Sequence, residues 1–436
     1  MSIEIIVILI WVFLLLLMLT GFSIAFSMLT VSIVGYALFI GPHALPGLYS
    51  VAFRNITLDI FIAIPLFLFM AVILQVSGTG ERLYNAMHKW MGGLRGGLAI
   101  GTVIVCTIIA AATGLGGTGT VMMGLLAFPE MMKRGYDKRM ALGCIPAGGA
   151  LGPLIPPSVP AIVISGLGGL SAGKLFMAGI IPGLLCSLFF CVYIGIICFI
   201  KPELGPPIPI EERSSWKEKF IALGKISGAM GLIIVVLGGI YAGVFTPSEA
   251  GGIGAGGALI LAIYDRSLTF KKTMDAVTMT IKVNAMVMWI VVGGACFSSL
   301  CGITGTTQFL TDVLTGLPLG PHAVLSIMLS ILFILGFFID NTAIILIALP
   351  VMLPTAIALG FDPLWFALLF NMMVIIGMIT PPFGYNLFYM KGLNLPGVTM
   401  MDIYIGTLPY IPLMLLALVL TVLFPQLALW IPNMMK

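Results

Sequence analysis

Charged residues are scarce in this chain. Only 8% of its 436 residues are Asp, Glu, Lys or Arg, and 60% are hydrophobic. A soluble domain carries about 25% charged residues, so the composition excludes a soluble globular protein. It predicts an all-α, polytopic integral membrane protein whose apolar stretches are long enough to cross a lipid bilayer as helices. The net charge of +4 is too small and too dispersed for a nucleic-acid-binding surface.

The side chains that usually build catalytic and metal sites are also few. The three histidines lie at or near the ends of apolar stretches, where placement at the membrane interface is expected. The seven cysteines lie in apolar stretches without metal-ligand spacing, so we interpret them as small buried hydrophobic residues. The chain has no Walker A sequence, nucleophile elbow or HExxH motif. We therefore expect no enzyme activity, and no ATP hydrolysis by this chain.

Two apolar stretches are interrupted where a plain transmembrane helix would continue. One interruption is Asp340–Thr342, and the other is Gly377–Gly384, which contains Pro381 and Pro382. An aspartate at the bilayer centre costs about 2.5–3.5 kcal/mol, and a proline pair removes two backbone donors. Such interruptions persist where they are buried in protein or line a wet cavity. Paired broken helices indicate the ion and substrate site of a transporter.

The same pattern occurs earlier in the chain, at a constant separation of 225 residues. The earlier break is preceded by a segment rich in Gly and Thr, residues 113–120. Six residues recur in register: Pro129, Gly135, Asp137, Gly152, Pro156 and Pro157 correspond to Pro354, Gly360, Asp362, Gly377, Pro381 and Pro382. These identities predict two copies of one unit; coincidence among 53 glycines and 27 prolines is the alternative.

The apolar and polar stretches predict membrane spans, interfacial arms and two repeats, which we name scaffold spans, arms and transport repeats. Each transport-domain repeat is expected to hold a re-entrant hairpin and a broken helix. For the first hairpin, two short full spans joined by a loop are the alternative. The predicted parts are first scaffold spans (1–76), an interfacial arm (77–96), the first transport repeat (97–174), scaffold spans (175–303) with a polar cytoplasmic linker (201–225), a second arm (304–321), the second transport repeat (322–392), and the last span with the C-terminus (393–436).

Within these parts, the expected helices begin and end at changes in composition. The first hairpin is expected as helices 97–112 and 121–132, with an unwound tip between them. The second hairpin is expected as 323–338 and 343–358. The span before the second arm is expected at 283–303, after an interfacial stretch at 265–272.

The distribution of Lys and Arg predicts the orientation of the two repeats. Both ends of the first hairpin carry basic residues, Lys89 and Arg95 before it and Lys133 and Arg134 after it, so both are expected in the cytoplasm. The ends of the second hairpin, near His322 and Asp362, carry neither Lys nor Arg and are expected outside. The repeats are then of inverted topology, and both termini are periplasmic.

Helix breaks free backbone carbonyl oxygens, which can hold an alkali cation together with Ser, Thr, Asn or Asp oxygens. The candidate ligands for such a cation are Thr113, Gly114, Gly116, Thr118, Gly152, Pro153 and Ser158 in the first half, and Asp340, Asn341, Thr342, Gly377, Thr380 and Pro381 in the second. The free N–H groups of half-helix N-termini suit an anionic substrate. The candidate substrate ligands are Thr120, Ser158, Asn341, Thr342 and Asn386.

Each candidate has a purely structural alternative. The glycines between residues 114 and 119 can equally serve close helix packing, and the hydroxyls of Ser158 and Thr380 can bond to their own helices. Asp340 is harder to explain in this way, because an aspartate in an apolar hairpin needs a cation, a donor or water. Glu130, Asp137 and Asp362 lie near basic residues or helix starts and are expected as caps and topology charges.

Three stretches resemble the large membrane subunit of tripartite ATP-independent periplasmic (TRAP) transporters, the M or DctM-type permease. They are Gly114–Pro129, GYDKRMALGCIPAGGALGPLIPPS at 135–158, and GMITPPFGYNLF at 377–388, and the resemblance extends over essentially the whole chain. It implies an elevator-type transporter of the bacterial inner membrane, coupled to Na+, that imports an organic acid. It also implies two partners, a small four-helix membrane subunit (Q), expected as a separate chain, and a periplasmic solute-binding protein (P).

Two other functions remain as alternatives. A stand-alone Na+/anion symporter of the same superfamily would need no binding protein. A membrane-embedded enzyme or assembly scaffold would need a cluster of His, Cys or acidic residues inside the membrane, and only Asp340 qualifies.

Overall fold

The computed structural model describes residues 2–114, 116–337, 339 and 341–435. The described residues form helices joined by turns, with no β-strand among them. The first half contains α1 (Ile3–Leu19), α2 (Ile24–Gly35), the short helices η1 (Tyr36–Ile40) and η2 (Pro42–Ala44), α3 (Leu45–Ile56), η3 (Asp59–Ile62), α4 (Ala63–Val76), α5 (Thr79–Met91), α6 (Gly97–Thr113), α7 (Gly116–Lys133), α8 (Lys138–Gly149), α9 (Val159–Gly168) and α10 (Ala172–Ile200).

The second half repeats this order after a connecting segment. That segment holds η4 (Pro202–Leu204), η5 (Ile210–Glu212) and α11 (Trp216–Gly224). The repeated elements are α12 (Ser227–Tyr241), α13 (Pro247–Tyr264), α14 (Phe270–Ile303), α15 (Thr306–Thr315), α16 (Pro321–Leu335), α17 (Asn341–Ala358), α18 (Pro363–Gly377), α19 (Tyr385–Gly392), α20 (Met400–Thr407) and α21 (Tyr410–Leu423), and α22 (Gln426–Met434) ends the chain.

The duplication therefore extends well beyond the two transport repeats. Helix α7 begins at Gly116 and α17 at Asn341, while α8 begins at Lys138 and α18 at Pro363, so both pairs are 225 residues apart. The same offset relates α1 to α12, α2 to α13, and α3 with α4 to the long α14. The cap expectation is confirmed at equivalent positions: Asp137 accepts from Met140 N at 2.9 Å and Asp362 from Trp365 N at 2.8 Å, as N-cap carboxylates do.

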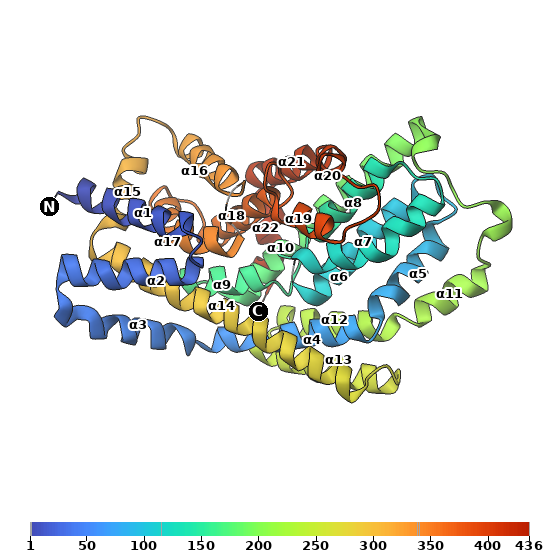
Figure 1. Ribbon diagram of the computed structural model, residues 1–436, viewed down its shortest axis with the longest axis horizontal. Coiled ribbons are helices and arrows are strands. Elements are labelled where there is room, and N and C mark those ends of the chain that lie inside the picture. Colours follow the sequence, from blue (N-terminus) through green and yellow to red (C-terminus); the bar gives the residue numbers. More distant parts are fainter. Residues whose placement is uncertain (1, 115, 338, 340, 436) are drawn as a thin grey trace.

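The two halves pack around an approximate twofold relation. Helix α2 packs against α14, and their counterparts α13 and α4 pack against each other. Such reciprocal contacts are typical of a twofold arrangement. In Figure 1 the arm α5 and its counterpart α15 lie toward opposite ends of the molecule, and α14 runs in the opposite direction to α3 and α4. Equivalent helices are thus inverted relative to each other.

Several helix boundaries differ from the sequence expectations. Helix α7 begins at Gly116 rather than at residue 121, and Gly114 at the tip has the left-handed φ of +62°. Helix α14 has 34 residues and begins at Phe270 rather than at 283, because Thr269 caps it by accepting from Lys272 N. The helices α3, α11 and α22 were not expected, since they are short and two of them mix polar with apolar residues.

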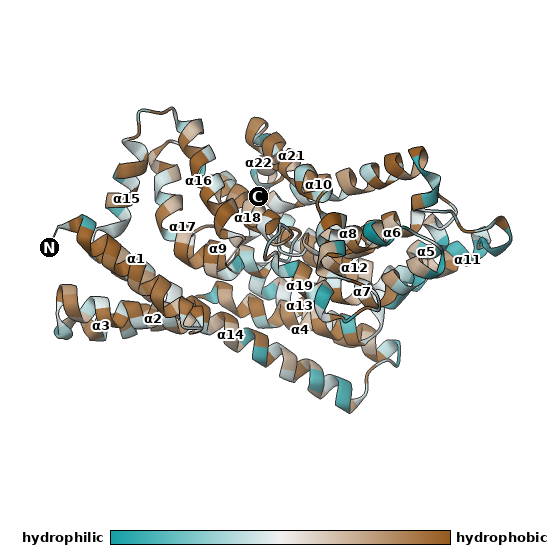
Figure 2. Cartoon of the chain, turned by 45° about the horizontal axis from the view of Figure 1, so that its top comes forward, coloured by the Kyte–Doolittle hydropathy of each residue, from teal (hydrophilic) through white to brown (hydrophobic). Residues whose placement is uncertain are grey.

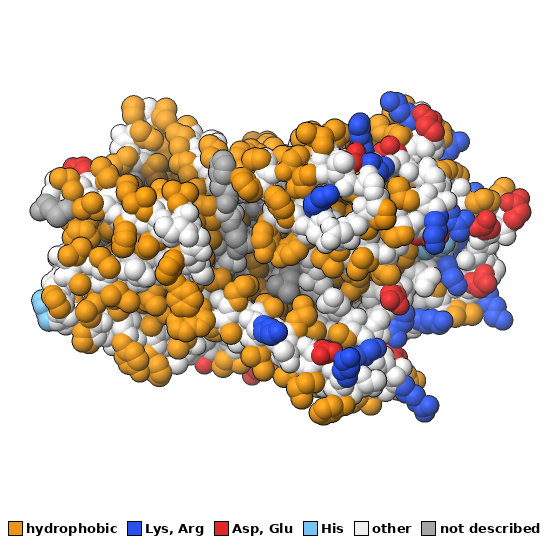
Figure 3. Space-filling view, in the orientation of Figure 1, with side chains coloured by type: hydrophobic (Ala, Val, Ile, Leu, Met, Phe, Trp, Pro, Cys, Tyr) orange, Lys and Arg blue, Asp and Glu red, His pale blue; other side chains and the backbone are white. Residues whose placement is uncertain are grey.

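Five helical stretches of the described residues are long and apolar enough to cross a membrane: Asp59–Val76, α10, α14, α17 and Met400–Leu423. Several shorter apolar helices, including α6, α16 and α18, accompany them. Hydrophobic residues cover α1–α3, while polar residues gather on α5, α11 and the start of α14 (Figure 2). On the face in Figure 3, Lys and Arg crowd the end of the molecule that carries α5, α8 and α11, and the opposite end shows none.

Candidate functional site

The turn of the first hairpin lies directly against the first helix break. A Cβ added to Gly114 would lie 2.0 Å from the carbonyl oxygen of Pro157, so only glycine allows this approach. In the second repeat, a Cβ on Gly336 would lie 2.8 Å from the Cα of Gly377. Each hairpin tip is therefore in backbone contact with the break of its own repeat. Both proline pairs, Pro156–Pro157 and Pro381–Pro382, are joined by cis peptide bonds.

The two repeats meet where their equivalent residues face one another. A Cβ on Gly116 would lie 3.3 Å from the ring of Pro153 and 2.8 Å from Met378 Cε. Pro153 and Met378 are themselves 225 residues apart, as are Gly116 and Asn341. In the second repeat, the side-chain nitrogen of Asn341 lies 3.8 Å from the sulfur of Met378. Gly116, Pro153, Met378 and Asn341 thus form the point of contact between the hairpin tips and the breaks.

The carbonyl oxygen of Pro153 accepts two hydrogen bonds at this point. One comes from the hydroxyl of Ser158 at 2.5 Å, within the same break, and the other from Asn371 Nδ2 at 2.9 Å. Ser158 Oγ in turn accepts from Ala161 N at 3.2 Å and caps α9. A carbonyl oxygen has two lone pairs, so both are in use, and Pro153 serves here as a link between α18 and the first break.

A second link joins the repeats beside the first. Thr120 of α7 donates to Asn386 Oδ1 at 2.9 Å, and Asn386 Nδ2 donates to the carbonyl oxygen of Pro146 at 2.6 Å. Both side chains are fully buried. Two residues expected at the substrate site are therefore in direct contact, and they hold α19 of the second repeat against α7 and α8 of the first.

Where the hairpin tips meet the helix breaks, three buried oxygens have no hydrogen-bond partner among the described residues. They are Thr113 Oγ1 at the first tip, Asn341 Oδ1 at the start of α17, and Asn371 Oδ1 in α18. The residues are 4%, 5% and 2% exposed. A buried polar atom left without a partner costs about 1–3 kcal/mol, so these oxygens are available to a ligand that supplies positive charge or a donor.

The remaining predicted residues occupy more ordinary positions. Thr380 Oγ1 donates to Ile376 O at 2.7 Å, within its own turn. Thr118 lies on α7 and is half-buried, Thr342 is half-buried in the first turn of α17, and Pro381 is half-buried. Gly152 and Gly377 are buried. Asp340 lies outside the described residues.

Sequence reasoning missed Asn371. The signal was present, because Asn371 is the single polar side chain in the otherwise apolar helix PLWFALLFNMMVIIG. A lone amide on a buried helix needs partners, and its nitrogen finds one in Pro153.

Solved structures with the same fold are membrane transporters. The chain superposes on the YdaH transporter of Alcanivorax borkumensis with a TM-score of 0.67 and 15% identity, covering 99% of this chain and 100% of that one. MtrF of Neisseria gonorrhoeae gives a TM-score of 0.64 at 13% identity, covering 98% and 94%. At these identities the likeness concerns the fold alone. The inverted halves with paired broken helices are therefore a fold that this chain shares with those transporters.

The family follows from the sequence comparisons. The family model described as the tripartite ATP-independent periplasmic transporter, DctM component, matches residues 10–427, and the chain belongs to this family. It is 31% identical to the C4-dicarboxylate TRAP transporter large permease protein DctM of Vibrio cholerae, over 86% of each protein. It is also 31% identical to the ectoine TRAP transporter large permease protein TeaC of Halomonas elongata (96% and 97%), and 28% identical to the sialic acid permease SiaM of Vibrio cholerae (86% of each).

Proposed function

We propose that this permease couples the import of an organic acid to the entry of Na+. The observation that carries the proposal is the group of unpartnered buried oxygens of Thr113, Asn341 and Asn371, where hairpin tips meet helix breaks. These are neutral oxygens, which suit a monovalent cation better than a divalent one, since divalent sites are built largely from carboxylates. Asp340, next to Asn341 in the sequence, would add one negative charge.

The substrate is proposed from the relatives and from the helix termini. The names of two relatives refer to C4-dicarboxylate and sialic acid, and a carboxylate is the group that they share. Helices α7, α9, α17 and α19 begin beside the breaks, and free N–H groups at helix N-termini favour anions. Thr120, Ser158, Asn341, Thr342 and Asn386 are the proposed substrate ligands. In the described conformation Thr120 and Asn386 bond to each other, so substrate binding there would exchange this contact.

The transport movement is proposed as an elevator. The hydrogen bonds from Asn371 to Pro153 and from Asn386 to Pro146 join the two broken helices, and the bond from Thr120 to Asn386 joins α7 of the first hairpin to them. With the second hairpin, these elements would form one body. That body would move as a unit against the helices outside residues 97–174 and 322–392, with the hairpins re-entrant. The concentration of Lys and Arg at the α5, α8 and α11 end (Figure 3) supports a cytoplasmic position for that end, an inner-membrane location and periplasmic termini.

Two partner proteins are proposed. The family is tripartite by its description, so a periplasmic binding protein would deliver the substrate and a small four-helix membrane subunit would join the scaffold. The chain matches the isethionate TRAP transporter permease protein DctMQ of Oleidesulfovibrio alaskensis at 32% identity, over 86% of this chain and 58% of that protein. The longer relative leaves room for a second unit.

Uptake into liposomes tests the proposal. The permease and the small subunit are reconstituted together, and a panel of radiolabelled organic acids is offered with and without an inward Na+ gradient and with and without the binding protein. Uptake that needs both the gradient and the binding protein is expected. Uptake with Na+ alone would favour the stand-alone symporter, and uptake indifferent to Na+ would contradict the coupling.

A further inference from the structure

A cavity outside the transport site lies between the arm α5 and the connecting helix α11. It measures about 180 Å³ and is lined by Arg82, Asn85, Lys89, Ile221, Ala222 and Lys225. Three cations, one amide and two apolar side chains make up this lining, without a carboxylate. We propose that the cavity binds the phosphate-bearing headgroup of an anionic phospholipid from the leaflet on this side. This site is separate from the proposed Na+ and substrate site and does not depend on it.

The charges around the cavity leave an excess of positive charge. Arg82 pairs with Asp265 at 2.6 Å, while its Nε is buried and has no hydrogen-bond partner among the described residues. Lys89 and Lys225 form no ion pair within the part of the chain that the structure describes. Glu218, the acid on α11, is engaged in capping its own helix, since it accepts from Ser215 N at 2.8 Å and from Ser215 Oγ at 3.0 Å. Two lysines without an ion-pair partner, beside Arg82, suit a phosphate group.

The wall formed by α11 has the features of a helix at the membrane surface. Trp216, Phe220 and Ile221 are 68%, 61% and 51% exposed, although they are large and apolar. Aromatic residues with exposed faces and neighbouring lysines are characteristic of the interface between headgroups and acyl chains. Helix α11 is also bent by 49° from the apolar α12 that follows it, so it leaves the direction of that helix. A lipid with its headgroup in the cavity would place its acyl chains against these exposed side chains.

The two helices that form the cavity are held against each other. Trp90 of α5 donates from Nε1 to the carbonyl oxygen of Lys219 at 3.0 Å, and its ring packs edge-on against Trp216 and Phe220. These contacts hold α11 against α5 at the level of Lys89. The site is therefore preorganised, which reduces the entropy that binding would cost.

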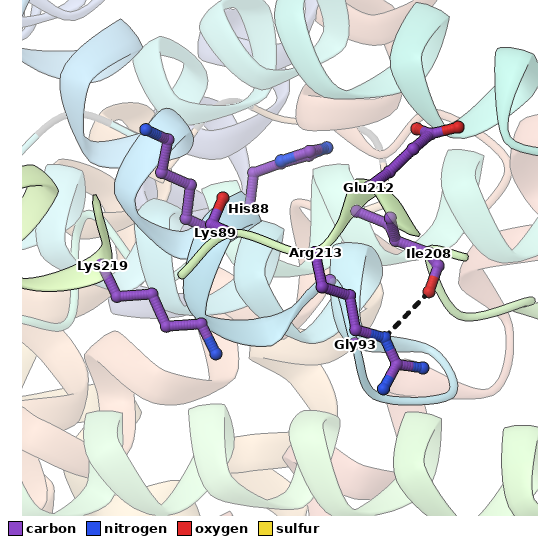
Figure 4. A pocket seen from close by; sticks show the side chains of 9 residues that line it. His88, Lys89, Gly93, Ile208, Glu212, Arg213 and Lys219 are labelled. Atoms are coloured by element: carbon purple, nitrogen blue, oxygen red, sulfur yellow. Dashed lines mark hydrogen bonds between the residues drawn. The ribbon is translucent and has the colours of Figure 1, made fainter. Parts of the chain in front are cut away.

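A neighbouring pocket shows why the headgroup belongs in the larger cavity. Lys89 lines both this pocket and the larger cavity, and Lys219 of α11 lines this pocket. The pocket measures only about 30 Å³. Figure 4 shows its lining side chains, with Arg213 Nε donating to the carbonyl oxygen of Ile208 at 3.1 Å. Glu212 also lines this pocket. A pocket this small, with a carboxylate in its lining, does not suit a phosphate.

Lipid binding to the purified full-length permease tests the proposal. The protein in detergent is titrated with phosphatidylglycerol, and binding is measured by native mass spectrometry, with phosphatidylethanolamine as the zwitterionic comparison. The variant Lys89→Gln/Lys225→Gln is compared with Lys217→Gln/Lys271→Gln, which removes the same charge from lysines outside the cavity. The cavity variant is expected to bind phosphatidylglycerol at least about tenfold more weakly, and the control pair is expected to bind as the wild type does.

Several outcomes would overturn the proposal. Equal weakening in both double variants would mean general electrostatic attraction, and equal binding of phosphatidylethanolamine would mean that the headgroup charge is not recognised. Glycerol 3-phosphate is added as a soluble competitor; displacement of the lipid at equal concentration would assign the site to soluble phosphates instead. If the double variant does not fold, Lys225→Gln alone carries the test, because Lys225 is exposed at the end of α11 and can be replaced without disturbing the core.

Discussion

The side-chain nitrogen of Asn371 lies 2.9 Å from the carbonyl oxygen of Pro153. One atom belongs to the second repeat and the other to the helix break of the first, 218 residues away along the chain. Ser158 donates to the same oxygen, so the break is held from both sides. The other end of the amide, Asn371 Oδ1, has no partner among the described residues. A single side chain thus joins the repeats and offers an oxygen to the centre of the proposed ion site.

Replacing this amide should weaken Na+ binding. Leucine in Asn371→Leu roughly keeps the shape of the side chain. The hydrogen bond to Pro153 and one candidate ligand oxygen are lost. Each such loss is worth about 1–3 kcal/mol, so we expect the Na+ concentration for half-maximal uptake to rise about tenfold or more. Uptake into proteoliposomes at varied Na+ concentration measures this change.

The control Asn433→Leu changes the same residue type at an exposed position in α22 and should behave as the wild type. An unchanged Na+ dependence in Asn371→Leu would exclude Asn371 from the site.

Asp340 carries a prediction that rests on the sequence. Asp340→Ala should reduce Na+-dependent uptake at least several-fold, because a negative charge beside Asn341 favours a cation. Asp362→Ala is the matched control, since Asp362 caps α18 by accepting from Trp365 N at 2.8 Å. Loss of this cap should lower the free energy of unfolding by about 1 kcal/mol. It should leave the Na+ dependence of uptake unchanged. Wild-type sodium dependence in Asp340→Ala would exclude this residue as a ligand.

Gly114 should tolerate no side chain. In Gly114→Ala the new Cβ would lie 2.0 Å from the carbonyl oxygen of Pro157, and a backbone atom cannot move aside as a flexible side chain can. We expect loss of transport together with a lower unfolding temperature in detergent. Gly169→Ala separates the two causes, because Gly169 has a similar φ of +64° but no atom within 4 Å of its Cβ. It should show only the strain of the left-handed conformation, about 1–2 kcal/mol.

The inverted orientation can be measured by labelling. In a variant lacking the native cysteines, Gly320→Cys at the exposed start of α16 should react with a membrane-impermeant maleimide added to spheroplasts. Lys217→Cys on α11 should react only after permeabilisation. The reverse pattern would mean that the repeats are placed in the membrane the other way round.

His88 predicts a pH dependence of stability. Burial lowers the pKa of His88; Arg134 and Lys89 lower it further, and the opposing effect of the carboxylates Glu130 and Glu212 is smaller. The native state therefore binds fewer protons than the unfolded state, and stability should fall as the pH drops below the ordinary histidine pKa of about 6.5. In His88→Gln the unfolding temperature should fall less between about pH 7 and pH 5 than it does in the wild type. The exposed His43→Gln should leave that slope unchanged; equal slopes in all three proteins would contradict the prediction.

Much of the fold could be predicted because the constraint of the bilayer is strong. Pro156, Pro157, Pro381 and Pro382 interrupt apolar helices that cannot be interrupted in lipid without compensation, so the breaks were visible in the sequence. The caps at Asp137 and Asp362 followed from position alone. The transport class and the family were confirmed through the same stretches.

The rest depends on packing, which a single sequence does not encode locally. The extent of the tip was overestimated because glycine and threonine in residues 116–120 favour loops by propensity, whereas contact with Pro153 and Met378 holds them in α7. The relation of α3 and α4 to α14 was missed because the first copy is interrupted at residues 57–62. The partnership of Thr120 with Asn386 joins residues 266 positions apart, and only the three-dimensional arrangement reveals it.

The equivalence of the two halves also bears on the proposed transport movement. Residues 3–200 and 227–423 have the same element order but different local shapes, as the interruption between α3 and α4 against the unbroken α14 illustrates. If each half adopted the shape of the other, the protein would keep its contacts in kind while the hairpin tips and breaks faced the opposite side. In the proposed elevator, the shape of one half is thus a template for the other half in the second state.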